Sequence, residues 1–326
     1  MRLSTPSALD HTLASWAERL RERLDLPLLV RWQGGSLRLG QFEQALVTVD
    51  VRDAAGATAL LAPSLDNLGR AYVEGHIDVD GRVQDVIEVA HRLAEASARQ
   101  DGRAGWVQRA ALRMASAMGH SRAQDRAAIR HHYDVSNDFY AEWLDAAMVY
   151  SCAYFETGQE SLAEAQQRKI DHILTKLRLA PGQTLLDIGC GWGALVLRAA
   201  QQFGARCVGI TLSQNQHALA RERVQAAGLA EHVGLKNLPT YFRRLHELLA
   251  PDGWALNHGI TATDPDNGET RHGGGRFIDR YVFPQGELPH IGTVLTTLQR
   301  GGLEPVDVEN LRRHYARTLQ CWSEAF

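Results

Sequence analysis

The residues that could do chemistry in this sequence begin with an acid and three regularly spaced glycines, Asp187, Gly189, Gly191 and Gly193. An apolar stretch at 184–188 precedes them and a helical pattern follows. Glycines let the backbone approach a ligand without a clash from a Cβ atom. The amides at the start of a helix offer hydrogen-bond donors and a partial positive charge. This arrangement is typical of the nucleotide site of a doubly wound sheet.

The spacing of the glycines narrows the choice of ligand. The pattern D-x-G-x-G-x-G differs from a dinucleotide turn, and no Lys-Ser/Thr pair follows that would make a phosphate-binding loop. An acid just before the first glycine is typical of S-adenosylmethionine (SAM) sites in methyltransferases. We therefore predict a SAM site, with a dinucleotide site and a tight turn without a ligand as the alternatives. No acid follows the next strand, so Thr211 and Gln216 are the candidate partners of the ribose hydroxyls.

The composition is that of an ordinary globular protein. A length of 326 residues suggests two domains or one large one, and 44% hydrophobic with 22% charged residues is usual for such a chain. A net charge of −3 gives no general attraction to nucleic acid. The four cysteines show neither CxxC nor CxH spacing, so we expect reduced thiols and no metal site. The N-terminal twenty residues lack a continuous apolar core, which favours a cytoplasmic protein without a signal peptide or membrane span.

The elements that must position the glycine turn fall into two regions. Residues 1–98 predict a small α+β domain, whose amphipathic N-terminal helix either docks on that domain or contacts a membrane surface. Residues 99–128 predict a partly helical linker, whose arginines form a solvated face or contact phospholipid headgroups. In the small domain we expect strands at 28–32, 36–40, 45–51 and 58–61, a turn at 54–56, and helices at 65–74 and 83–93.

Residues 129–326 predict a doubly wound α/β domain around the glycine turn. Its first segment, 129–155, is dense in aromatic residues, which form either core or a lid over the cofactor. The helices expected at 213–227 and 238–249 follow each other without a strand between them, which breaks the alternation of strand and helix. We expect strands at 184–188, 206–211 and 254–260, and helices at 162–179, 194–203, 213–227 and 238–249.

The sequence resembles one family closely, the cyclopropane-fatty-acyl-phospholipid synthases and related SAM-dependent lipid methyltransferases. The resemblance implies a Rossmann-like doubly wound SAM-methyltransferase domain, preceded by a small α+β lipid-binding-like domain. It also implies an unsaturated phospholipid substrate at the membrane surface, peripheral membrane association, no nucleic acid partner and a possible homodimer. The matching stretches are GRAYVEGHIDVDG, HHYDVSNDFY, YSCAYF, LLDIGCGWG, GITLSQNQ, EHVGLKNLPTYF and FIDRYVFPQGELP.

The same resemblance implies a reaction and the residues that carry it. The alkene of an unsaturated acyl chain attacks the methyl carbon of SAM, and the resulting cation loses a proton from the new methyl group and closes a cyclopropane ring. A bound bicarbonate is the implied base, held by Cys152, Glu231, His258, Ile260 and Tyr315. The implied SAM contacts are Tyr150, Ser151, Gly189, Cys190, Gly191, Gly193, Thr211, Leu212 and Gln216.

Two stretches depart from the family pattern. About 30 residues, the size of one βαβ unit, are absent between Ala230 and Glu231, and the family's last helices do not follow Phe326. One missing strand would lie beside the glycine-motif strand, so we predict a gap at the centre of the sheet. The alternatives are an acyl-chain methyltransferase without ring closure, an inactive lipid- or SAM-binding relative, and a small-molecule methyltransferase.

Overall fold

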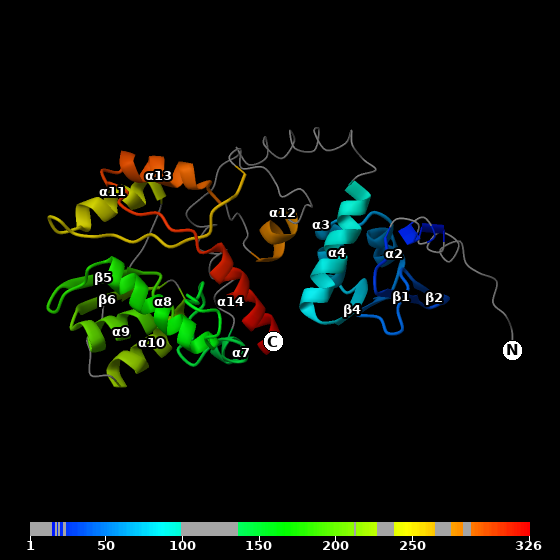
Figure 1. The fold of residues 1–326 in the computed structure, drawn as a ribbon, viewed down its shortest axis with the longest axis horizontal. Helices are drawn as coiled ribbons and strands as arrows, with labels where there is room; N and C mark the ends of the chain where they lie inside the picture. The colour runs from blue at the N-terminus through cyan, green and yellow to red at the C-terminus, as the bar shows by residue number, and fades with distance from the viewer. Residues whose placement is uncertain are drawn as a thin grey trace. The chain divides into compact units, whose positions relative to one another are not determined.

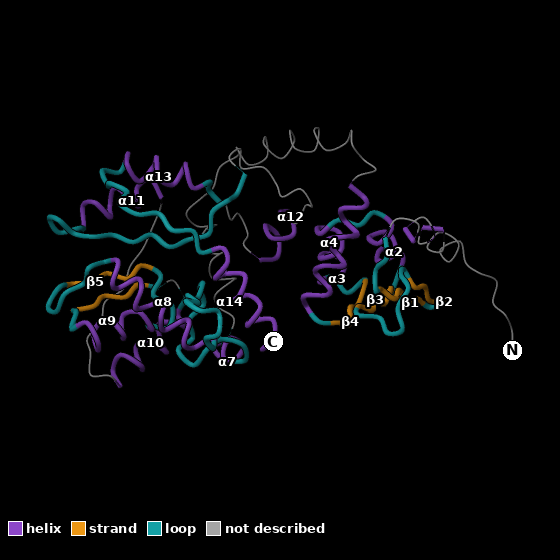
Figure 2. Tube along the Cα trace, viewed as in Figure 1, coloured by secondary structure: helices purple, strands orange, loops and turns teal. Residues whose placement is uncertain are grey.

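The computed structural model describes residues 15–16, 18, 20–21, 24–98, 136–211, 213–226, 238–264, 275–282 and 288–326, without the side chains of 97–98, 226, 238–241 and 279. The chain divides into two compact units, which we treat separately (Figures 1 and 2). The first comprises Met1–His120 and Gly268–Gly286, and the second comprises Ser121–Asn267 and Glu287–Phe326. The predicted linker at 99–128 lies outside the described residues.

The first unit contains a four-stranded sheet in the order β2-β1-β3-β4, in which β1 and β3 are parallel and the other pairs antiparallel. Alternate residues of β1 and β3 are buried, and Trp16 of the N-terminal segment joins the same core, as docking on its own domain requires. The elements are β1 (Leu28–Trp32), β2 (Gly35–Arg38), β3 (Val47–Val51), α2 (Ala54–Leu61), α3 (Leu65–Val73), β4 (Ile77–Gly81) and α4 (Val83–Ala98).

The strand that we predicted at 58–61 is wrong, because these residues belong to helix α2. The carboxylate of Asp53 accepts hydrogen bonds from the amides of Ala55 (2.9 Å) and Gly56 (3.0 Å), and so caps the helix at its N-terminus. The residues predicted as a turn at 54–56 are therefore the first helical turn. Alanine has the highest helix propensity, and with this cap it outweighs the strand preference of Thr58.

A short segment from the C-terminal half of the sequence also belongs to the first unit. It consists of α12 (Gly275–Phe277) and η1 (Ile278–Val282), and α12 packs on α3. The amide of Phe277 donates to Asp66 (2.7 Å), and the hydroxyl of Tyr281 donates to Glu74 (2.7 Å). This segment lies in the predicted methyltransferase domain, so the contact units divide the chain differently from the domains that we predicted from sequence.

The second unit is built on two parallel strands, β5 and β6, paired from Thr184↔Arg206 to Ile188↔Ile210. One face of the pair is buried, since Leu185 packs with Ile170 and Leu174 and with Ala199. The elements are α7 (Asn137–Ala141), α8 (Leu162–Lys176), β5 (Thr184–Ile188), α9 (Ala194–Phe203), β6 (Arg206–Ile210), α10 (Gln214–Ala226), α11 (Leu238–Leu248), α13 (Ile291–Arg300) and α14 (Arg312–Ala325).

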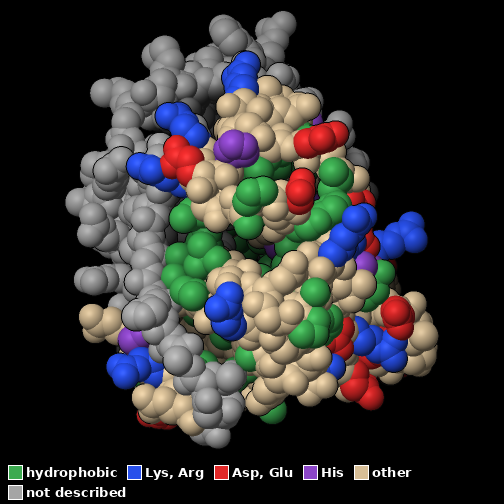
Figure 3. All heavy atoms as spheres, turned by 90° about the vertical axis from the view of Figure 1, so that its left-hand side faces the viewer, with side chains coloured by type: hydrophobic (Ala, Val, Ile, Leu, Met, Phe, Trp, Pro, Cys, Tyr) green, Lys and Arg blue, Asp and Glu red, His purple; other side chains and the backbone are tan. Residues whose placement is uncertain are grey.

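The other face of the pair and one of its edges are uncovered among the described residues. Leu186 and Ile188 of β5 are each 38% exposed, although both are large apolar side chains. The strand that we predicted at 254–260 is wrong, because this segment forms no ladder and only Ala262, just beyond it, makes an isolated bridge. The backbone amides and carbonyls of a strand need hydrogen-bond partners on a neighbouring strand, and the segment predicted to be missing would supply that strand. Figure 3, which views the second unit from the left-hand side of Figure 1, shows a hollow rimmed by hydrophobic side chains.

The C-terminal helix α14 packs against the segment that precedes α8 in the second unit. Thr318 is fully buried, and its hydroxyl accepts a hydrogen bond from the amide of Ala153 (3.0 Å) and donates one to the carbonyl of His314 (2.8 Å). One turn further on, the indole ring of Trp322 lies 5.5 Å from that of Trp143. The helix therefore holds the segment that carries the YSCAYF motif.

We predict that Thr318→Val lowers the free energy of unfolding by about 1–3 kcal/mol, because the amide of Ala153 then stays buried without an acceptor. Denaturation in urea at neutral pH measures the change. Thr296→Val is the matched control: its hydroxyl donates to the carbonyl of Gly292 (2.8 Å) at an exposed site, and we expect a change within about 0.5 kcal/mol. Equal losses in the two variants would contradict this account of α14.

Candidate functional site

The glycine turn after β5 leaves open space beside its backbone. Gly189, Gly191 and Gly193 have φ angles of +89°, +55° and +86°, which favour glycine. A Cβ atom at Gly189 or Gly191 would have nothing within 4 Å. The amides of Gly189 and Cys190 donate to the carbonyl of Ile210 (2.7 and 2.9 Å), so the turn is fixed to β6. It lies at the carboxyl end of parallel strands, where doubly wound folds bind ligands, and it fits the close approach that SAM requires.

The side chains around the turn support it from the protein interior. Cys190 is 9% exposed, and a Cβ added to Gly209 would lie 3.0 Å from its sulfur, so this side chain faces β6. The indole of Trp192 is buried and donates to the side chain of Asn137 (2.8 Å). Cys190 therefore packs as a core residue, and any contact with a cofactor would come from its backbone.

The two residues predicted to face a ribose lie together after β6. The hydroxyl of Thr211 donates to the side-chain oxygen of Gln216 (2.7 Å), and Gln216 is 5% exposed. Leu212, which the family resemblance implied as a further SAM contact, lies outside the described residues. The role of this pair in cofactor binding stays a prediction.

Tyr150 stands in a cluster of aromatic rings. Its ring centroid lies 5.4 Å from that of Tyr140, 5.3 Å from that of Trp143 and 5.4 Å from that of Trp322. Tyr140 in turn lies 5.0 Å from the ring of Trp192 in the glycine turn. The described aromatic segment before the first strand therefore packs around the buried Tyr140 and connects Tyr150 to the turn, although Phe139 is 40% exposed.

The residues predicted to hold bicarbonate are brought together only in part. Cys152 is buried, with its sulfur 3.8 Å from the carbonyl of Leu311 at the start of α14. Burial raises the pKa of Cys152 to about 11, so at neutral pH it is an uncharged thiol. Tyr315 lies one turn into α14, with its ring 6.2 Å from that of Trp322, which also contacts Tyr150. The C-terminal helix thus links two of the five predicted residues.

The other three predicted holders are less constrained. His258 is exposed; partial desolvation, and then the Lys169 ammonium, lower its pKa. Ile260 is 52% exposed. Glu231 lies outside the described residues. The catalytic roles of all five stay predictions.

Sequence analysis missed two polar residues at this site, Gln166 and Lys169. Lys169 is 5% exposed, and its ammonium donates to the hydroxyl of Ser151 (2.9 Å). Gln166 is 1% exposed and donates to the carbonyls of Val149 (3.1 Å) and Ser151 (2.8 Å). The available signal was two polar residues, three apart, on the face of α8 that also carries the buried Ile170 and Leu174.

Asp187, the acid of the glycine motif, is half-buried, and its charge interacts with that of the buried Lys169. Burial raises the pKa of Asp187 to about 6, against the lowering effect of Lys169. Burial also lowers the pKa of Lys169 to about 8, against the raising effects of Asp187, Asp145 and Cys152. Between these values both groups are charged. Strongly perturbed groups in a cleft are typical of functional sites.

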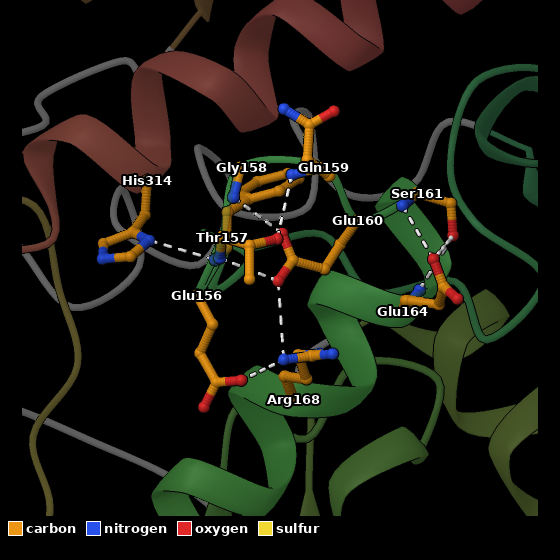
Figure 4. Close-up of polar contacts among 10 residues, drawn as sticks. Glu156, Thr157, Gly158, Gln159, Glu160, Ser161, Glu164, Arg168 and His314 are labelled. Atoms are coloured by element: carbon orange, nitrogen blue, oxygen red, sulfur yellow. Dashed lines mark hydrogen bonds and ion pairs between the residues drawn. The ribbon is translucent and has the colours of Figure 1, made fainter.

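The N-terminus of α8 is anchored by the turn that precedes it (Figure 4). The buried carboxylate of Glu160 accepts hydrogen bonds from the amides of Thr157 (3.0 Å) and Gly158 (2.9 Å) and pairs with Arg168 at 3.4 Å. These contacts lower the pKa of Glu160 to about 2. Ser161 caps the helix through a reciprocal pair of bonds with Glu164. The anchor fixes the helix that carries Gln166 and Lys169 beside the YSCAYF segment.

Among the described residues, no group of three or more His, Cys, Asp or Glu side chains is arranged to hold a metal ion.

Within the same ranges, no helix combines the length and apolar character needed to cross a bilayer.

The fold and the site define a Rossmann-like, SAM-dependent methyltransferase. The cyclopropane synthase MmaA2 from Mycobacterium tuberculosis has a similar structure, with a TM-score of 0.55 and 35% identity over 61% of this chain and 82% of that one. The mycolic acid cyclopropane synthase CmaA1 complexed with S-adenosylhomocysteine and CTAB gives a TM-score of 0.56, with the same identity and coverage.

The chain belongs to the mycolic acid cyclopropane synthetase family, whose model matches residues 120–231 and 223–326. A domain family of unknown function matches residues 15–102. The probable fatty acid methyltransferase of Pseudomonas putida is 41% identical over 332 residues, which cover 93% of this chain and 82% of the relative. A probable fatty acid methyltransferase of Mycobacterium tuberculosis is 38% identical and covers 86% of this chain. These matches confirm the predicted family.

The matches also bear on the segment predicted to be missing. The family model matches in two pieces that meet at residues 223–231, where the predicted loss lies. The alignment with the Pseudomonas putida relative spans 332 positions, but 93% of 326 residues is about 303, so about 29 positions have no residue in this chain. A loss of this size agrees with one βαβ unit.

We predict that Asp187→Asn becomes more stable relative to the wild type as the pH rises from about 4 to about 6. Below this window the carboxyl group is neutral in both the folded and the unfolded chain. Above it, the folded wild type carries a charge that burial disfavours, so this group's contribution to stability falls as the pH rises. The gain should be on the order of 2–3 kcal/mol, since one pKa unit is worth about 1.4 kcal/mol.

Chemical denaturation at several pH values between 4 and 7 measures this difference. Asp171→Asn is the control, because Asp171 pairs at 2.8 Å with Arg198, which stays charged over this range. We expect a small, pH-independent loss in the control, about 0–1 kcal/mol. A flat difference between Asp187→Asn and the wild type would contradict the raised pKa of Asp187.

Proposed function

We propose that this chain transfers a methyl carbon from SAM to the cis double bond of an unsaturated phospholipid acyl chain and closes a cyclopropane ring. The observation that carries the proposal is the open glycine turn beside an uncovered apolar surface. No atom lies within 4 Å of a Cβ built at Gly189 or Gly191, and Leu186 and Ile188 of the adjacent strand are exposed. An acyl chain is the kind of ligand that such an apolar surface accommodates.

The chain's own residues would bind, orient and shield the reactants. SAM supplies an electrophilic methyl group on a sulfonium when it is bound. The glycine turn receives the cofactor, and Thr211 and Gln216 offer neutral hydrogen-bonding groups to it. The aromatic cluster around Tyr150 excludes water from one side of the site, which protects a developing carbocation from hydration.

The proton that leaves the new methyl group needs a base, and we propose bicarbonate for this role. Cys152 fits an anion, because its raised pKa keeps it an uncharged thiol that can donate a hydrogen bond. Tyr315 would offer a hydroxyl donor from the same side, and His258, Glu231 and Ile260 would complete the holder. Bicarbonate would supply the base at this position.

The proposal extends to the setting of the reaction. The substrate would be a phospholipid already in a bilayer, so the chain would associate peripherally with the membrane from the cytoplasm. The names of the relatives, fatty acid methyltransferase and mycolic acid cyclopropane synthase, support a lipid acyl substrate. A homodimer remains part of the proposal.

A second candidate function is a SAM- or lipid-binding relative without turnover. One observation favours it: residues 254–260, which carry His258 and Ile260, make no ladder with β5 among the described residues. SAM binding at the glycine turn can therefore persist in a chain whose segment 254–260 does not support catalysis.

We predict that the purified chain binds SAM saturably in calorimetry and that Gly191→Asp weakens this binding at least about tenfold. The new side chain would fill the space that the cofactor needs and would place a negative charge at the turn. Gly182→Asp is the matched control, because Gly182 also has a positive φ (+83°) and a Cβ added there would have nothing within 4 Å. Equal weakening in both variants would show backbone strain instead of a site, and no binding by the wild type would refute the proposed function.

We predict that vesicles of unsaturated phospholipid gain the mass of one CH2 group per acyl chain when they are incubated with the enzyme and SAM. With SAM that carries a trideuterated methyl group, ring closure removes one deuteron and leaves two in the lipid. A methyl branch formed without loss of a methyl proton keeps all three. Mass analysis of the lipids thus separates ring closure from simple methylation, and saturable SAM binding without any mass gain identifies the non-catalytic candidate.

A further inference from the structure

Lys169 is a buried lysine that none of the roles described above uses. It lies on α8, and its side chain is 5% exposed. Its ammonium donates to the hydroxyl oxygen of Ser151 at 2.9 Å. Because burial of a lysine is costly unless the charge is compensated, its place beside the glycine motif calls for a reason.

The bond between Lys169 and Ser151 fixes the direction of the Ser151 hydroxyl group. A charged lysine has three donors and no acceptor, so the oxygen of Ser151 must accept in this bond. The hydroxyl proton of Ser151 is then free to point elsewhere. Gln166 holds the carbonyl of the same serine at 2.8 Å, so one face of α8 fixes both the backbone and the side chain of Ser151.

The charged and titratable groups around Lys169 come from several segments. Asp187 is the penultimate residue of β5, two positions before Gly189. Asp145 and Cys152 belong to the segment before α8, and His258 lies on the extended segment after α11. The two carboxylates stabilise the ammonium, while His258 is disfavoured as a cation beside it. Lys169 therefore stands between the glycine turn and the Tyr150–Cys152 segment.

Resting on the proposed function, we propose that Lys169 is a positioning residue of the SAM site, which directs the hydroxyl proton of Ser151 toward the bound cofactor. Lys169 itself does not touch the cofactor in this arrangement. It acts through Ser151, and the ligand group that receives the Ser151 proton is an acceptor such as the carboxylate of the amino-acid part.

This arrangement makes cofactor binding depend on pH in a particular direction. Burial lowers the pKa of Lys169 to about 8. Above that pH the neutral amine has a lone pair and can accept the Ser151 proton, so Ser151 no longer donates to the cofactor. Affinity for the cofactor should therefore fall as the pH rises through about 8.

The test is calorimetric binding of S-adenosylhomocysteine, the stable product of methyl transfer, between pH 6.5 and 9.5. Lys169→Met keeps an unbranched apolar side chain but removes the charge and the donor. We expect roughly tenfold to hundredfold weaker binding at pH 7, the usual range for loss of a hydrogen bond to a charged group. We also expect the decline above pH 8 to disappear. The ligand's own amino group titrates in every variant, so the difference between the profiles reports Lys169.

A double-mutant cycle separates positioning from a general loss of structure. If Lys169 acts through Ser151, then Ser151→Ala and Lys169→Met together weaken binding no more than about either change alone. Lys176→Met is the matched control on the same helix, because Lys176 pairs with the carboxylates of Asp307 and Glu309 away from Ser151. It should bind with wild-type affinity and keep the wild-type pH profile.

The possible failures are distinguishable. Wild-type chain that does not bind the ligand overturns the proposed function and this inference together. Wild-type binding matched by Lys169→Met at every pH, or additive effects in the cycle, overturns this inference alone. Should Lys169→Met melt below the assay temperature, Ser151→Ala decides: a surviving decline above pH 8 in that variant overturns the inference, and loss of the decline supports it.

Discussion

The site depends on two backbone hydrogen bonds, from the amides of Gly189 and Cys190 to the carbonyl oxygen of Ile210. They extend the parallel pairing of β5 and β6 by one step beyond the last ladder residues. This extension fixes the backbone of the turn at Gly191, after which α9 starts. It also places Thr211 at the same end of the strand pair. The pairing of β5 with β6 is therefore the smallest part of the sheet that can present a cofactor site, and the predicted loss of strands falls on the other edge of β5.

That other edge is where the shortened chain differs from a complete doubly wound sheet. Within the described ranges, the segments after α11 and α13 form no ladder with β5. Side-chain contacts hold them instead: Arg178 lies 4.1 Å over the ring of Trp254, and Lys176 pairs with Asp307 and Glu309. Exposed contacts of these kinds contribute about 0.5–1 kcal/mol each. The half of the site with His258 is thus held less firmly than the half with Cys152.

The sequence predicted the local elements around the turn well, because glycines mark both ends of α9 and the apolar run of β5 is short and bounded. It failed at 58–61, where a capping carboxylate decided the structure, and at 254–260, where a strand-like pattern lacks a partner. The amino-acid pattern of a segment does not show whether the neighbouring strand that it needs for hydrogen bonding is present. Lys169 was missed for a related reason: the burial of a lysine is a property of the packed site and not of its own position in the sequence.

The two halves of the site would lose their functions in a definite order when strands are missing from the sheet. The cofactor half is self-contained, since β5, β6, α8 and the aromatic cluster around Tyr150 contact one another directly. It also places the buried Lys169 near the half-buried Asp187, and charged groups with perturbed pKa values are typical of functional sites. The half of the site that we propose to hold the base draws on residues from both sides of the segment predicted to be missing. Under the proposed mechanism, a chain shortened at this strand would therefore lose control of the departing proton before it lost the cofactor, because only proton control would require the gap to be bridged.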